Sequence, residues 1–171
     1  MKTLLAALYI LLALVSSSAA DGKKPFGRVT ALEMSVGDTL KISYESNGCF
    51  HNNRHELVLA KTEKGVTLSG ADLSRFWDET TQKAVEGRRR PLLTADLDTA
   101  KLTRLDRSFE YLRAAHPDGC TTIDDFTVTQ ERGGKVIAFE VFRDATCHLD
   151  DDKERMSFYE LVALISPKKK P

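Results

Sequence analysis

The side chains best suited to chemistry in this chain are one thiol and two imidazoles in a single short segment. Cys49, His51 and His55 lie close together in the sequence, and the pair Cys147-His148 follows much later. Thiolate sulfur and imidazole nitrogen are ligands that zinc and copper accept. If the two segments meet, Cys49, His51, His55 and His148 would form a metal site. The spacing matches no standard motif, so we favour a polar loop without a cofactor and keep zinc or copper as the alternative.

Cys49 could also act as a nucleophile, because His51 and Arg54 lie near enough in the sequence to favour its thiolate. That would make the protein a thiol-dependent hydrolase or a redox protein. The chain contains no Gly-x-Ser-x-Gly, no His-Glu-x-x-His and no phosphate-binding glycine loop. We therefore assign no catalytic residue and favour a protein that is not an enzyme.

The other two cysteines, Cys120 and Cys147, flank the clearest hairpin of the sequence. Residues 121–130 and 135–143 are β-favouring runs joined by the turn at Arg132-Gly133-Gly134. Pairing them about this turn brings Cys120 opposite residue 145, within reach of Cys147. A disulfide between Cys120 and Cys147 is the pairing we predict, while a bond from Cys49 to either of them remains open.

Two further groups could contact a partner. Phe76 and Trp77 form the strongest aromatic pair, and Arg88-Arg89-Arg90 is a basic run. We favour core packing for the aromatic pair and a solvated loop for the arginines, and keep an interface as the alternative. The possible interface residues are Phe76, Trp77, Arg88, Arg89 and Arg90.

The N-terminus has the layout of a secretory signal peptide. Lys2 precedes an apolar run of about a dozen residues, shorter than the roughly 20 that span a bilayer, and Ser18 and Ala20 supply small side chains before a cut. We expect a signal peptide at 1–20, one domain at 21–166 and a basic disordered tail at 167–171. The product is secreted or periplasmic, with no membrane span in the mature chain.

Charge narrows the class of partner. The full chain has 25 basic and 25 acidic side chains, and loss of Lys2 with the leader leaves a formal charge of −1. Such a balance gives no broad field to attract a polyanion, and no specific nucleic-acid signal is present. The expected partner is an unidentified protein or a small ligand.

The coarse pattern predicts an α+β fold. Strands are expected at 28–34, 39–46, 56–61, 66–68, 121–130 and 135–143, and helices at 96–115 and 152–165. Segment 49–54 reads as a loop, and segment 72–85 is ambiguous between helix and strand. The prediction is a mostly antiparallel sheet with two or three helices on one face. The function we favour is a binding or interaction module for a ligand or an envelope enzyme, with the metal protein and the thiol protein as alternatives.

Overall fold

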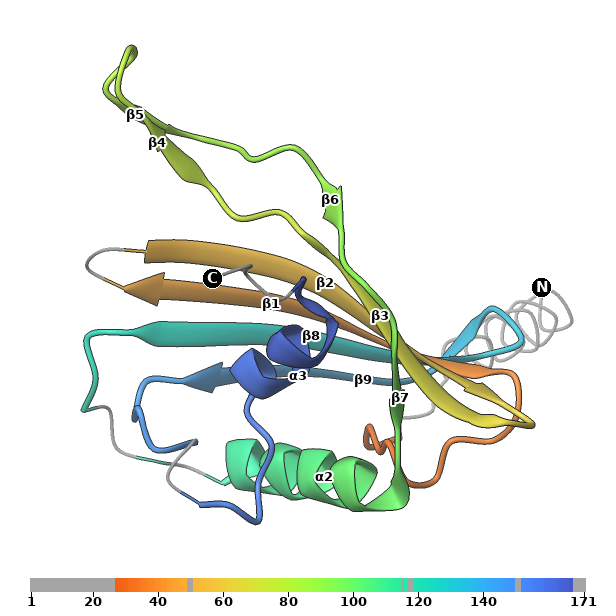
Figure 1. The fold of residues 1–171 in the computed structure, drawn as a ribbon. Coiled ribbons are helices and arrows are strands. Elements are labelled where there is room, and N and C mark those ends of the chain that lie inside the picture. The colour runs from red at the N-terminus through yellow and green to blue at the C-terminus, as the bar shows by residue number, and fades with distance from the viewer. Residues whose placement is uncertain (1–26, 49–50, 115, 117–118, 150–151, 168–171) are drawn as a thin grey trace, which may run out of the picture.

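A twisted antiparallel sheet with two helices over one face forms the body of the molecule (Figure 1). The computed structural model describes residues 27–48, 51–114, 116, 119–149 and 152–167. Its long strands are β1 (Asp38–Gly48), β2 (His51–Thr62), β3 (Gly65–Asp72), β8 (Ile123–Arg132) and β9 (Lys135–Asp144). The short strands are β4 (Phe76–Asp78), β5 (Lys83–Val85), β6 (Arg90–Pro91) and β7 (Ala95–Leu97), and the helices are α2 (Thr99–Arg113) and α3 (Phe158–Ile165).

The main sheet has the order β6-β3-β2-β1-β8-β9, and β7 also pairs with β3. Every pairing between these strands is antiparallel. Strand β1 is central and shows why the sequence alternates there: Leu40, Ile42 and Tyr44 are buried, whereas Lys41 and Ser43 are exposed. This period of two places one face of the sheet against the helices and the other in water.

Helix α2 follows the apolar spacing read from the sequence. Leu102, Leu105, Phe109 and Leu112 are buried, and the side chain of Asp98 accepts a hydrogen bond from the backbone N–H of Lys101 at the start. The α+β prediction with a mostly antiparallel sheet is therefore confirmed. Two helices form in the part of the chain that the structure describes, and none of them is long and apolar enough to cross a membrane.

Helix α3 begins later than the predicted residue 152. Its N-cap is Ser157, which accepts from the backbone N–H of Glu160 at 3.1 Å. Just before it, the buried hydroxyl of Ser108 on α2 donates to the carbonyl of Met156 and accepts from the N–H of the same residue. The Met156 peptide is thus bound to a neighbouring helix instead of to its own turn, and the helix starts only after it.

The predicted strand at 28–34 is wrong. Backbone N–H groups of this segment bond to side chains: Val29 to Glu140 at 2.9 Å, and Ala31 and Leu32 to Asp106 on α2 at 2.6 and 3.1 Å. The neighbours of β1 are β2 and β8, so the hairpin expected between 28–34 and 39–46 does not exist. Carboxylates distant in sequence satisfy this backbone in place of a strand partner.

One other segment differs from its prediction, and the segment left ambiguous forms strands. Strand β2 starts at His51, so residues 51–54 are part of the sheet and not of a loop. Segment 72–85 forms the hairpin of β4 and β5, with Phe76 opposite Val85 and Asp78 opposite Lys83, and no helix. A third helix on the face of the sheet is therefore not formed there.

Candidate binding surface

Residues 73–91, here called the arm, leave the body between the end of β3 and β7. They contain β4, β5 and β6, and the β4–β5 hairpin extends well beyond the main sheet (Figure 1). At the root, β6 pairs with the end of β3, and the N–H groups of Leu73 and Arg75 donate to the carbonyls of Arg54 and Asn52 on β2. The root is therefore fixed to the sheet, while the hairpin is not.

Short polar contacts shape the arm locally. At its tip, the Asp78 carboxylate accepts from the N–H of Thr80 and the hydroxyl of Thr81, at 2.9 and 2.8 Å. These hydrogen bonds, that from Thr81 first, hold the pKa of Asp78 below its usual value. Nearer the root the two chains of the arm come very close: a Cβ on Gly87 would lie 2.2 Å from the carbonyl oxygen of Ser74. Glycine is required there for this approach.

Charged side chains concentrate at the root. Arg90 binds the carboxylate of Asp72 at 2.5 Å, and Arg89 pairs with Glu56. Glu86 lies 3.7 Å from Arg75. Asp72 is only 18% exposed, but at least one partner of each pair is largely exposed, so each pair contributes little to stability and mainly orients the side chains.

Arg88 differs from its neighbours. Between described residues it takes part in no ion pair, and its side chain is exposed. A hollow of about 340 Å³ lies beside it. The lining residues are Ser74, Arg75, Phe76, Gly87, Arg88 and Arg90. Three guanidinium groups next to an exposed phenyl ring can bind a carboxylate or another anion and cover an apolar group beside it.

The interface residues named from the sequence all belong to the arm. Phe76 lies in β4 and is 57% exposed, and Trp77 follows it, with a side chain outside the described part. Arg88 and Arg89 lead into β6, which begins with Arg90. The hollow between them was not foreseen, because it depends on the approach of Ser74 to Gly87 across the arm.

The residues considered for a metal site are only partly described. Cys49 and the side chain of His51 lie outside the described residues. His55 is 8% exposed on the inner face of β2, and His148 is exposed after β9. Strands β1 and β8 lie between β2 and β9, three spacings of about 4.8 Å. Among the described side chains, no group of three or more His, Cys, Asp or Glu residues is placed to hold a metal ion.

His55 instead faces Asp72, which the sequence analysis did not single out. The two are directly opposite in the β2–β3 pairing, with Nε2 3.8 Å from a carboxylate oxygen. Burial lowers the pKa of His55, and the Asp72 charge opposes this effect. Burial raises the pKa of Asp72, but hydrogen bonds from Ser74 and the charge of Arg90 outweigh it, so this pKa is lowered. The turn of the β2–β3 hairpin lies at Glu63-Lys64, and counting outward from Lys64-Gly65 would have set His55 opposite Ser74 instead.

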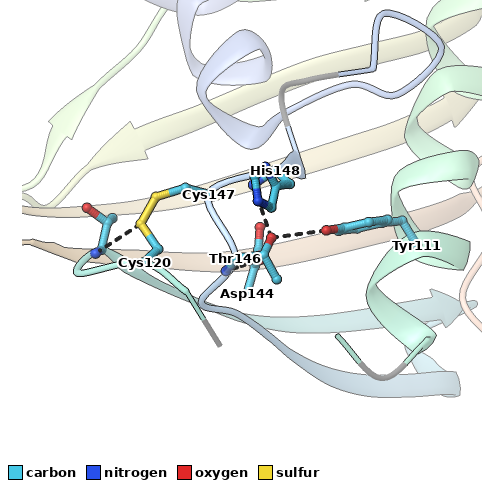
Figure 2. Close-up of a disulfide and its surroundings, with 7 residues drawn as sticks. Tyr111, Cys120, Asp144, Thr146, Cys147 and His148 are labelled. Carbon is cyan, nitrogen blue, oxygen red and sulfur yellow. Dashed lines mark hydrogen bonds between the residues drawn. A yellow bond between two sulfur atoms is a disulfide. The ribbon is translucent and has the colours of Figure 1, made fainter. Parts of the chain in front are cut away.

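Cys120 and Cys147 form the disulfide predicted from the hairpin (Figure 2). Their Cα atoms are 5.5 Å apart, and the N–H of Cys120 donates to the carbonyl of Ala145 at 2.8 Å. Beside the bond, the Thr146 hydroxyl lies 3.0 Å from that of Tyr111 on α2 and donates to Asp144. The bridge closes the open end of the β8–β9 hairpin. It lies at the same end of the strands as the root of the arm, but β2 and β1 separate the two across the sheet.

Comparison with known proteins adds no assignment. No protein-family model matches the chain, and neither a curated protein nor a solved structure shows a significant match to it.

Proposed function

We propose that this chain is a small exported binding module without catalytic activity, and that the arm is its contact surface for a protein partner. The observation that carries the proposal is that the arm exposes a phenylalanine and several arginines, and that its β4–β5 hairpin extends beyond the body (Figure 1). Aromatic and arginine side chains are the types most enriched where protein interfaces derive their binding energy.

The arm is dispensable for the core, which supports a role in contact. The buried apolar cluster comes from the main sheet, the two helices and the segments between them, and it includes no described side chain of residues 73–91. A hairpin of this size is at most marginally stable by itself in water. An element that adds so little to the fold but exposes Phe76 is explained by burial against another molecule.

Export supports the same proposal. The leader-like N-terminus argues for passage out of the cytosol, and a disulfide such as Cys120–Cys147 persists where conditions are oxidising. The partner would then be another exported protein or a protein of the cell envelope.

Site-specific photo-crosslinking tests the proposal. A benzophenone amino acid replaces Phe76 on the arm or, as a control, Val36, which is 60% exposed beside the opposite end of β2. Each protein is irradiated in the native extracellular fluid. We expect one reproducible adduct from position 76 that position 36 does not give. The same adducts from both positions, or none from position 76, would contradict the proposal.

A further inference from the structure

The chemistry of the arm also points to the kind of segment that it binds. Resting on the proposed function, we infer that the partner presents an acidic segment in which carboxylate side chains flank an apolar one. The carboxylate lies against Arg88 in the hollow, and the apolar side chain covers Phe76. The charges that line the hollow determine which class of ligand it can bind.

The lining is entirely cationic among its charged members. Arg75, Arg88 and Arg90 contribute guanidinium groups, and none of the described carboxylates lines the hollow. Arg75 and Arg90 are each oriented by an acidic neighbour, Glu86 and Asp72 respectively. Arg88 has no such neighbour among the described residues, so its guanidinium fork is available to a carboxylate in bidentate geometry.

A protein segment fits the arm better than a polyanion does. Besides its five basic residues, the arm carries Asp78, Glu79 and Glu86. The closely spaced phosphates of a polyanion would be repelled by these carboxylates. The chain as a whole also has no net positive charge to attract a nucleic acid or an anionic membrane. In a peptide whose carboxylates are separated by apolar side chains, one carboxylate can reach the hollow while the others stay away from Asp78, Glu79 and Glu86 of the arm.

The apolar half of the ligand is defined by Phe76. Its ring is exposed at the edge of the hollow, and Gly87 has no side chain to cover it. An arginine beside an exposed ring is the combination that binds a carboxylate and an adjacent apolar side chain at the same time. Both contacts are needed, because an exposed charge pair alone contributes little.

Two charge-reversal variants test the inference. Arg88→Glu places a carboxylate at the hollow, and Arg143→Glu makes the same change at an exposed arginine on β9. Each is combined with a photo-crosslinker at Thr80 on the arm tip, away from the hollow. We expect Arg88→Glu to lower the yield of the partner adduct about tenfold and Arg143→Glu to leave it unchanged. With Arg88 unchanged, about 1 M salt should also lower the yield of the partner adduct, because it shortens the Debye length to about 3 Å.

Binding of defined probes gives the second readout. The probes are short fluorescent peptides with alternating Glu and Leu, peptides with Lys in place of Glu, single-stranded DNA, and vesicles of phosphatidylcholine with phosphatidylserine. We expect binding of the Glu/Leu peptide alone, and its loss in Arg88→Glu and in Phe76→Ser. Stronger binding of DNA or vesicles would overturn the inference in favour of a polyanion.

The outcomes separate this inference from the proposed function. An adduct from Thr80 that neither Arg88→Glu nor salt reduces, with no binding of the Glu/Leu peptide, leaves the arm as a contact surface but refutes the acidic segment. Absence of any adduct from positions 76 and 80 refutes the contact surface, and the inference with it. Circular dichroism of each variant confirms that the sheet is intact, because the substituted side chains lie outside the core.

Discussion

His55 on β2 lies directly opposite Asp72, the last residue of β3, with its Nε2 3.8 Å from the carboxylate. The other oxygen of that carboxylate accepts from Arg90 at the end of the arm. One carboxylate therefore contacts both a buried imidazole of the body and a guanidinium of the arm. Tyr44 stacks on the other side of His55, with ring centroids 6.0 Å apart, so the imidazole is enclosed by the sheet.

This arrangement predicts the pH dependence of stability. Burial lowers the pKa of His55 below 6.5, so the folded chain binds this proton more weakly than the unfolded chain does. The stability of the fold is therefore full above the unfolded pKa and is lost as the pH falls from the unfolded pKa to the lower folded pKa. We expect the Tm to fall between about pH 7 and pH 5 and to fall less steeply in His55→Gln. The exposed His116→Gln variant controls for loss of a histidine, and an unchanged slope in His55→Gln would refute the prediction.

The contact between Ser108 and Met156 predicts a large effect from one hydroxyl. Ser108 is fully buried and satisfies both the N–H and the carbonyl of Met156. Ser108→Ala leaves these backbone groups buried and unpaired, which we expect to lower the free energy of unfolding by about 2 kcal/mol. Urea denaturation measures the change. Ser43→Ala, on the exposed face of β1, is the matched control and should change it by less than about 0.5 kcal/mol.

The disulfide predicts a dependence of stability on redox conditions. Cys120 and Cys147 are 27 residues apart, and closing a loop of this length stabilises the fold by about 3–4 kcal/mol in the chain-entropy model. Replacing both by Ala should lower the free energy of unfolding by about that amount, and dithiothreitol should then have no further effect. Cys49→Ser in every protein compared prevents exchange with the third thiol. Equal stability of the bridged and unbridged proteins would contradict the prediction.

The parts of the fold that the sequence predicts are those determined locally. Strand β1 alternates apolar and polar residues, and α2 repeats apolar residues at helical spacing, so either pattern identifies the element without knowledge of its neighbours. The disulfide can be predicted for the same reason. The turn between β8 and β9 is recognisable in the sequence, and counting outward from it brings Cys120 and Cys147 close together.

The parts that the sequence does not predict depend on distant side chains. Segment 28–34 has strand-like composition, but the side chains of Asp106 and Glu140 accept hydrogen bonds from its backbone N–H groups. Helix α3 starts late because Ser108 holds Met156. Sequence spacing cannot assign these carboxylates and this hydroxyl to their partners, since each pair is separated by many residues.

The candidate site divides in the same way. Residue type alone raises Phe76 and the arginines as possible contact residues, because aromatic and arginine side chains are enriched at interface hot spots, but it favours core packing for the ring and a solvated loop for the arginines. The hollow that brings them together depends on the approach of Gly87 to Ser74, which no sequence pattern indicated. The sequence thus indicates which residues could form the proposed surface, and its shape follows only from the fold.

Gly87 therefore gives the sharpest test of that shape. A methyl group there would meet the Ser74 carbonyl at 2.2 Å, so Gly87→Ala must push the two chains of the arm apart and open the hollow. The core does not extend into the arm, so we expect the free energy of unfolding of the body to change by less than about 0.5 kcal/mol. Crosslinking from Thr80 to the partner should nevertheless fall several-fold.

Gly119→Ala is the matched control, because its added Cβ would have no neighbour within 4 Å. It should change neither the stability nor the adduct. Since stability and binding are measured on the same protein, a loss of both in Gly87→Ala would show that the arm supports the fold. A loss of neither would show that binding does not depend on the hollow. Only loss of the adduct with an unchanged body agrees with an arm whose shape serves contact.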